Sequence, residues 1–262
     1  MKFYDPSVTS PVLGPDATTL LSHATYFDDF FEGGWVKDLA LSSESEPSGG
    51  KFSNHAESAA WNVSFHSGTD GVSTDEVIQI ANSADNGILE INTDADDDDV
   101  MSMQLNGEGF KLSAGRTIVY ETRISVDDAD TIDLFMGLGI DDVLPITAIS
   151  DYMGFGIVDG DASLQAVSGK DSTGEAIVTG NGTTLTDTGI DFEDGTATTK
   201  FLVLRMVATG SKVQYFSDGV LVATHTTSIP DDEHMTPTLS IRNGSSAVSK
   251  VFIDYIFCTQ NR

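Results

Sequence analysis

One short signal in the chain comes close to fixing its local structure: the Asp218-Gly219 pair between two β-rich segments. Lys212–Ser217 precedes the pair and Val220–His225 follows it, and both segments favour extended backbone. A tight hairpin turn needs positive φ, which glycine adopts without steric cost and aspartate tolerates. The pair therefore predicts a β-hairpin, and a hairpin joins antiparallel strands.

Alternation of apolar and polar residues extends this pattern along most of the chain. Ile132–Ile140 alternates, and its second face carries Gly137 and Gly139, which would let a neighbouring layer approach closely. Lys200–Ala208 is apolar on both faces, as expected of a central strand covered on both sides. Further strand candidates are 60–65, 77–81, 87–93, 100–105, 117–126, 152–158, 164–167, 175–178, 238–241 and 249–257. With no long amphipathic helix in view, the sequence predicts an all-β, antiparallel β-sandwich.

The N-terminal segment differs from the rest of the chain. Residues 1–24 contain three prolines, which disfavour helix, and scattered apolar side chains. We expect an extended arm over 1–24 and a single sandwich domain over 25–262, because no composition break marks a second domain. The residues expected to anchor the arm on a partner are Phe3, Tyr4, Val8, Val12 and Leu13.

Charge narrows the range of partners. The 13 Lys and Arg residues against 41 Asp and Glu residues give a formal net charge of −28. Such a field repels phosphate groups and anionic lipid, so we expect neither nucleic acid nor a membrane as a partner.

The start of the chain has no apolar segment typical of a secretory signal. The single cysteine, Cys258, lies in an apolar segment and is expected in or near the core.

Several segments, taken in their order and spacing, resemble a family of tailed-phage structural proteins with a concanavalin A-like (laminin G-like) jelly roll. The segments that carry the resemblance are Phe27–Phe31, Gly87–Thr93, Tyr120–Ile124, Met136–Leu138, Tyr152–Phe155, Val213–Gly219 and Asp254–Ile256. Each motif alone is weak, and together they extend over roughly residues 25 to 260. The resemblance implies a jelly roll and a virion component, notably a capsid decoration (cement) protein.

The same jelly roll also includes glycan-cleaving enzymes, whose activity depends on recognisable catalytic motifs. A retaining glycosidase needs two carboxyl groups about 5 Å apart, which laminarinase-like enzymes supply from Glu-x-Asp-x-x-Glu on one strand. Neither that motif nor the Gln-x-His and Tyr-x-Lys-x-Tyr of alginate lyases occurs in this chain. Glu121 and Arg123 share one strand face and are expected to form a half-exposed pair. The sequence therefore predicts no catalytic residues and a protein that is not an enzyme.

No metal or cofactor site is expected either. The Asp94–Asp99 run could offer oxygen ligands to Ca²⁺, but it lacks the spacing of a known calcium loop, so a solvated turn between strands is favoured. The five histidines have no zinc-ligand spacing. Trp35 and Trp61 could stack on a sugar ring, although core packing is favoured for both.

The resemblance implies a virion protein that is made in the host cytoplasm and binds the outer surface of an assembled phage head. The expected partner is the major capsid protein, and a homo-oligomer, trimer or dimer, is expected because symmetric assembly adds avidity. The alternative is a lectin-like carbohydrate-binding module, either free or carried on the virion and used in host attachment.

Overall fold

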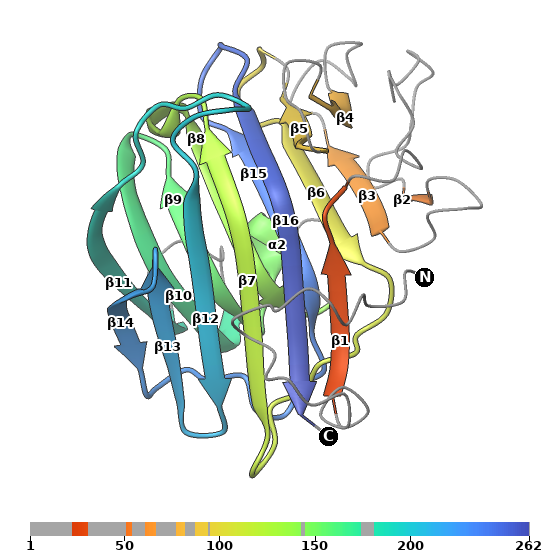
Figure 1. Ribbon diagram of the computed structural model, residues 1–262, viewed down its shortest axis with the longest axis vertical. Coiled ribbons are helices and arrows are strands. Elements are labelled where there is room, and N and C mark those ends of the chain that lie inside the picture. The colour runs from red at the N-terminus through yellow and green to blue at the C-terminus, as the bar shows by residue number, and fades with distance from the viewer. Residues whose placement is uncertain are drawn as a thin grey trace, which may run out of the picture.

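The computed structural model describes residues 23–30, 51–53, 61–66, 77–81, 87–93, 95–142, 145–173 and 181–261. These residues form two antiparallel sheets, with sheet A toward the viewer and sheet B behind it (Figure 1). Sheet A consists, in spatial order, of β14 (Val220–His225), β13 (Lys212–Ser217), β12 (Leu202–Thr209), β7 (Thr117–Val126), β16 (Lys250–Asn261), β5 (Leu89–Asn92) and β4 (Val77–Ile80). The remaining strand of sheet A, β1 (His23–Asp28), pairs with the C-terminal half of β16.

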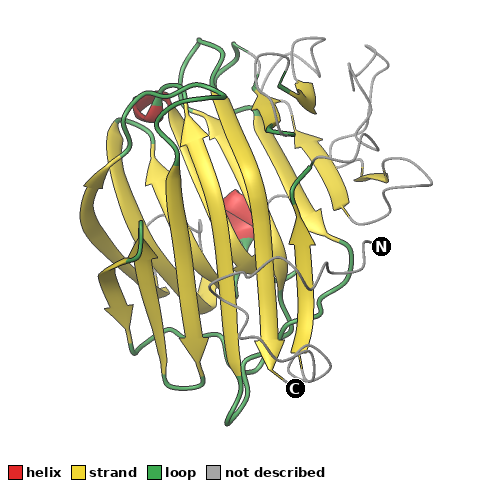
Figure 2. Cartoon of the chain, in the orientation of Figure 1, coloured by secondary structure: helices red, strands yellow, loops and turns green. Residues whose placement is uncertain are grey.

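Sheet B has the same number of strands. Its spatial order is β11 (Asn181–Asp191), β10 (Asp161–Thr173), β9 (Tyr152–Val158), β8 (Ile132–Gly139), β15 (Thr236–Asn243), β6 (Val100–Leu105), β3 (Trp61–His66) and β2 (Lys51–Ser53). The helices of the described residues are two short pieces, η1 (Ala129–Thr131) and α2 (Pro145–Ala148), and strands dominate the cartoon (Figure 2). The predicted all-β antiparallel sandwich is confirmed. No helix within the described ranges is long and apolar enough to cross a membrane.

The core lies between the two sheets and follows the alternation of the sequence. On β7, Ile118, Tyr120 and Ile124 are buried in the main cluster, whereas Glu121 and Arg123 lie on the outer face of sheet A. On β12, Leu204 and Met206 are buried, but the outward residues are only partly covered. The predicted cover on both faces of this strand is therefore incomplete.

A second apolar layer covers part of the outer face of sheet B. Ile146 of α2 and the adjacent Ile149 pack against Phe135 and Tyr152 of that face. A Cβ atom added to Gly139 would lie 2.2 Å from Ile149 Cδ1, so only glycine admits this contact. The predicted close approach of a layer is confirmed at Gly139, where the layer is a segment of the chain itself, whereas Gly137 is approached by the backbone of the neighbouring strand β9 (Tyr152–Val158).

The predicted hairpin forms between β13 and β14. Asp218 and Gly219 have φ of 48° and 80°, as a primed two-residue turn requires. The turn also bonds to β12: the Asp218 amide donates to the Val203 carbonyl at 2.8 Å, and Asp218 Oδ1 accepts the Val203 amide at 3.0 Å. These two bonds fix the turn against the neighbouring strand.

Other expectations have mixed outcomes. Trp61 is a core residue, and its indole nitrogen donates to Asp28 Oδ2 at 3.0 Å. Cys258 is buried in the same core, as expected. Sequence reasoning missed β1, β2 and β11 as strands. The arm anchors, Trp35 and the expected strand at 175–178 lie outside the described residues.

A buried polar cluster joins the two sheets at one margin. His225 of β14 is 2% exposed, with Nδ1 2.9 Å from Ser168 Oγ of β10 and Nε2 3.1 Å from Thr186 Oγ1 of β11. Its ring lies 4.8 Å from that of Tyr215, whose hydroxyl donates to the Val167 carbonyl at 2.8 Å. Burial without a carboxylate partner lowers the pKa of His225 to about 4.

This cluster generates a pH-dependent stability. The folded pKa is below the ordinary value of 6.5, so the stabilisation is complete above pH 6.5 and is lost as the pH falls toward 4. The difference between the folded pKa and the ordinary pKa of histidine corresponds to about 3 kcal/mol of unfolding free energy. In urea unfolding between pH 4 and pH 7, His225→Gln should remove this part of the pH dependence. The exposed His234→Gln variant is the control and should behave like the wild type; an unchanged profile for His225→Gln would contradict the assignment.

Candidate functional site

The outer face of sheet A carries aromatic and charged side chains in register. Glu121 of β7 lies opposite Phe257 of β16 on one side and Arg205 of β12 on the other. Because residues directly opposite in an antiparallel sheet share a face, the register extends this into a row across the sheet. From β1 to β14 the row reads Phe27, Phe257, Glu121, Arg205, Phe216 and Leu221. We call this surface, together with Arg123, Phe201, Asp254 and Tyr255, the sheet A face.

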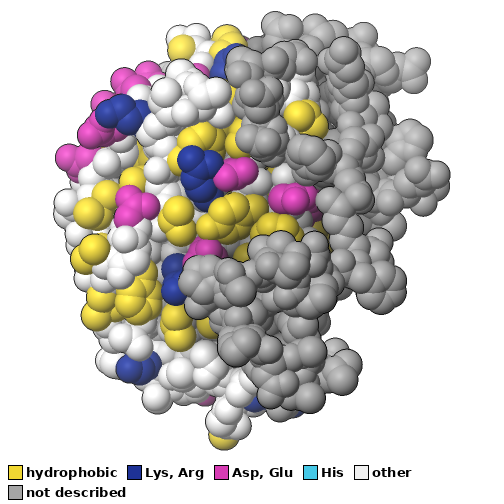
Figure 3. Space-filling view, in the orientation of Figure 1, with side chains coloured by type: hydrophobic (Ala, Val, Ile, Leu, Met, Phe, Trp, Pro, Cys, Tyr) yellow, Lys and Arg dark blue, Asp and Glu magenta, His cyan; other side chains and the backbone are white. Residues whose placement is uncertain are grey.

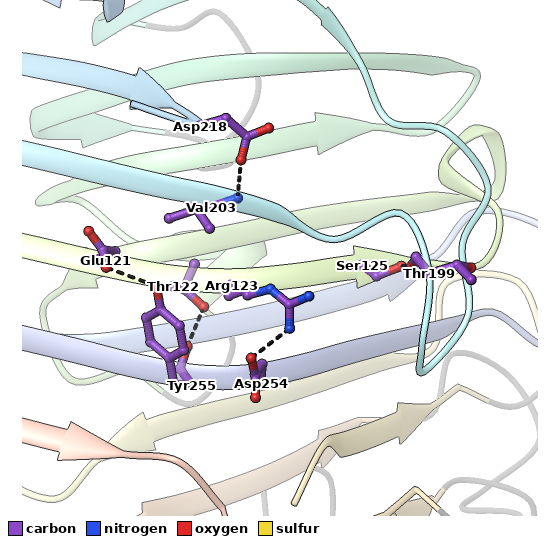
Figure 4. A network of polar contacts seen from close by, with 9 residues as sticks. All are labelled: Glu121, Thr122, Arg123, Ser125, Thr199, Val203, Asp218, Asp254 and Tyr255. Carbon is purple, nitrogen blue, oxygen red and sulfur yellow. Dashed lines mark hydrogen bonds and ion pairs between the residues drawn. The ribbon is translucent and has the colours of Figure 1, made fainter. Parts of the chain in front are cut away.

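Glu121 lies at the centre of the sheet A face and uses both carboxylate oxygens. Its Oε2 accepts from Arg205 Nε at 2.7 Å, and its Oε1 accepts from the Tyr255 hydroxyl at 2.8 Å. The Glu121 side chain is 15% exposed and that of Arg205 34%, so the pair is partly shielded from water. Figure 4 shows Tyr255 reaching across from β16 to Glu121 on β7. The charge at the centre is therefore both neutralised and fixed in position.

A β-bulge in β16 creates the second half of this network. Ile253 pairs with Ile124 and Tyr255 pairs with Arg123, so Asp254 is an extra residue between two consecutive pairs. A bulge breaks strict alternation and re-aims side chains. As a result Asp254 bonds to Arg123 while the adjacent Tyr255 bonds to Glu121 on the same face (Figure 4).

Arg123 is held from two sides. Its Nη1 donates to Asp254 Oδ2 at 2.6 Å, and its guanidinium carbon lies 4.1 Å from the centre of the Phe201 ring, in cation–π range. The expectation that Glu121 and Arg123 pair with each other is wrong, although they share a face as predicted. Each bonds to a residue of a neighbouring strand instead. Side chains on adjacent strands lie closer together than side chains two residues apart on the same strand, so the contacts across the sheet form first.

Tyr255 is a hydrogen-bond donor at neutral pH. Burial raises its pKa, and the bond to the Glu121 carboxylate raises it further. The phenol consequently keeps its proton, which it donates to Glu121. Its ring lies 6.1 Å from that of Phe27, which is 56% exposed.

The sheet A face is electrically balanced in a chain that is strongly acidic. Its two arginines each pair with one carboxylate, and Lys250 at the upper part of β16 pairs with Glu90. Figure 3 shows blue and magenta groups next to one another among yellow hydrophobic side chains on this side of the molecule. Such a surface offers aromatic and guanidinium contacts without the repulsion that a net charge of −28 creates elsewhere.

The acidic run behaves as a turn. Residues 95–99 form a bend that connects β5 of sheet A to β6 of sheet B, with Asp97 and Asp98 exposed. The turn is tied to the end of β15, where the Asn243 side chain donates to the Asp96 carbonyl at 2.9 Å. Within the ranges that the structure describes, no three His, Cys, Asp or Glu side chains lie close enough to hold a metal ion.

The sequence-predicted site and the sheet A face do not coincide. The expected anchors Phe3, Tyr4, Val8, Val12 and Leu13 lie outside the described residues. Sequence reasoning placed Glu121 and Arg123 on one outward face but did not identify Arg205, Asp254 and Tyr255 as their partners. The available signal was Asp254-Tyr255, two polar or amphipathic residues in succession inside an apolar strand, which is the pattern that a bulge produces.

The fold is shared with known structures. No family model and no curated protein matches the sequence. An endo-1,3-beta-glucanase from Streptomyces sioyaensis has 13% identity and a TM-score of 0.54, over 92% of this chain and 97% of that one. A lichenase from a mouse hindgut metagenome has 14% identity and a TM-score of 0.54, over 89% and 97%. A protein of unknown function from Shewanella oneidensis has 13% identity and a TM-score of 0.53, over 98% and 97%.

These likenesses confirm the concanavalin A-like jelly roll, and at such identities they show the fold alone. They also correct one expectation. The prediction that the chain is not an enzyme is contradicted, because the structures that share its fold over about nine-tenths of its length include glucanases. Because a shared fold does not by itself assign an activity, neither the fold nor the absence of the three catalytic motifs decides whether this chain is an enzyme.

The central ion pair makes a prediction about stability. Arg205→Met would leave the partly shielded Glu121 carboxylate with the Tyr255 hydroxyl as its remaining hydrogen-bond donor, at a cost of about 1–3 kcal/mol of unfolding free energy. Lys200→Met removes an ion pair whose partner, Glu193, is exposed, and should cost less than about 1 kcal/mol. Urea unfolding of both variants measures the difference; equal costs would show that the sheet A network is no stronger than an ordinary surface pair.

Proposed function

We propose that this chain is a decoration protein of a phage head and that it attaches to the assembled shell through the sheet A face. The observation that carries the proposal is the composition of that face: one exposed aromatic side chain, Phe27, and several partly buried ones around paired arginines, without net charge, on an otherwise acidic molecule. The resemblance of the sequence to phage structural proteins supplies the identity of the partner.

The residue types of the face suit a protein partner. Tyr, Phe and Arg are enriched at protein interfaces and dominate their binding energy, whereas Lys and Glu are depleted. Arg123 and Arg205 are already held by carboxylates, so little side-chain entropy is lost when a partner covers them. A row that extends from β1 to β14 fits an extended surface better than a small molecule, which favours a concave site.

The charge distribution sets the orientation on the shell. The acidic remainder of the chain would face solvent and keep crowded particles apart, while the balanced face meets the capsid protein. A contact that bridges neighbouring capsid subunits must be broken before those subunits separate. Attachment should therefore raise the heat resistance of the shell.

This proposal is tested by co-sedimentation with empty heads assembled from the major capsid protein of the same genome. Phe27→Ala and Tyr255→Ala should each weaken binding about tenfold or more, because both remove aromatic contact area from the face. The matched control is Val248→Ala, which removes an exposed side chain from the loop between β15 and β16. Failure of the wild type to sediment with the heads at micromolar concentration, or equal binding by all three variants, would contradict the proposal.

Glycan binding is the second candidate, and the fold shared with glucanases favours it. Exposed Phe27 and partly buried Tyr255 would provide ring surfaces beside the hydrogen-bonding groups of Arg123 and Asp254. Sedimentation with insoluble β-1,3-glucan, combined with an assay for released reducing ends, measures binding and cleavage in one experiment. Binding or cleavage that Tyr255→Ala abolishes, with no binding to heads, would favour this candidate.

A further inference from the structure

The two sheets end together at one margin of the molecule. Among the described residues, β11 pairs only with β10 at the end of sheet B, and β14 pairs only with β13 at the end of sheet A. Both strands lie on the left of Figure 1. The Thr186 and Thr184 hydroxyls hold them together, bonding to His225 at 3.1 Å and to Thr227 at 3.0 Å. This margin therefore presents two stacked strand edges.

Neither the Thr183–Thr186 stretch of β11 nor β14 carries charges or prolines that would block pairing, and the charges of β11, Asp187 and Asp191, lie beyond that stretch. Natural edge strands avoid association with lysine, proline, inward charges or bulges. Thr183–Thr186 and Val220–His225 contain no Asp, Glu, Lys, Arg or Pro, in a chain of which 21% is charged. Val220 and Leu221, 65% and 50% exposed, lie at the start of β14. β14 does contain a bulge, at Val222, so β11 is the better template for backbone pairing.

The regular part of β11 is complementary to itself. Thr183–Asp187 pairs with β10 without a shift, and the irregularities lie on either side of this stretch. If a second copy pairs antiparallel about Leu185, each Thr184 lies opposite the second copy's Thr186. Cross-strand threonine pairs are favourable, and no like charges meet within the stretch. The edge thus fits another copy of itself without a separate partner sequence.

We propose that two copies of this chain associate by antiparallel pairing of their β11 edges about a two-fold axis perpendicular to the sheets. Such a contact is isologous, so the same axis brings the two β14 edges toward each other. The exposed Val220 and Leu221 side chains would then be covered at the second, bulged edge. The dimer continues sheet B from one copy into the other.

This symmetry has a consequence for the sheet A face, and that consequence alone rests on the proposed function. A two-fold axis perpendicular to the sheets relates the two copies by a half-turn within the plane of the sheets. Both sheet A faces therefore point to the same side. One flat partner could contact both faces, and the second contact would form at the high effective concentration that the first provides. A dimer would therefore hold a shell more tightly than either copy alone.

The association is tested by sedimentation equilibrium of the full chain from about 1 to about 100 µM. The expected mass rises from the 27.9 kDa of one chain to twice that value. Added salt should strengthen the dimer, since screening reduces repulsion between two copies of net charge −28. Hydrogen exchange should show amides of Thr183–Asp187 protected in the concentrated sample and less protected after dilution. A single-chain mass at about 100 µM in high salt would overturn the proposal.

Two variants locate the contact. Thr184→Lys and Leu221→Lys each place a charge at one edge and should raise the dissociation constant at least about tenfold. Val248→Lys, an equally exposed change away from this margin, should leave it unchanged. Thermal melting checks that each variant is folded; should Thr184→Lys unfold, Leu221→Lys and the exchange of the wild-type amides still decide. A dimer that survives Leu221→Lys and shows no protection in β11 would place the contact elsewhere and overturn the proposal, whatever the result with phage heads.

Discussion

The pairing of β16 with β7 is the contact on which the rest of the fold depends. β16 borders β7 along nearly its whole length, while its other side pairs first with β5 and then with β1. The last strand of the chain thereby joins the first described one and aligns two other strands, β5 and β7. One added residue, Asp254, shifts this register and turns two consecutive side chains toward the same face. The same pairing thus sets the core on one side and the sheet A face on the other.

Local sequence patterns predicted much of the strand content but not its arrangement. Strands β6, β7, β9, β13 and β14 begin and end where alternation and the Asp-Gly turn placed them. β11 was missed because its residues, rich in Thr and Asp, lack a clear apolar face until the partner strand is known. β1 and β2 were missed because they are short, at six and three residues. Register between strands far apart in sequence is a tertiary property, and short-range periodicity does not contain it.

The sheet A face illustrates the same limit. Glu121 and Arg123 could be assigned to one outward face, because strand alternation is local information. Their partners come from β12 and β16, and Tyr255 reaches Glu121 only because of the bulge. A sequence pattern can therefore identify outward charges on a strand. Which side chains neutralise those charges depends on the strands that pair with it, and the pattern does not contain that information.

The two outer faces of the sandwich differ in what already covers them. On sheet B, Ile149 packs onto Gly139 and, with Ile146, covers Phe135, so the chain occupies part of this face itself. On sheet A, Phe27 and Leu221 are at least half exposed, and the outward residues of β12 are partly so. A sheet face rich in aromatic and aliphatic groups is costly to leave in water. The paired arginines reduce this cost in the free molecule and remain available as donors when a partner covers the face. Glucanases share this fold, and a shared fold does not dictate function. Function depends instead on which face of the sandwich is left open and on the side chains that it carries.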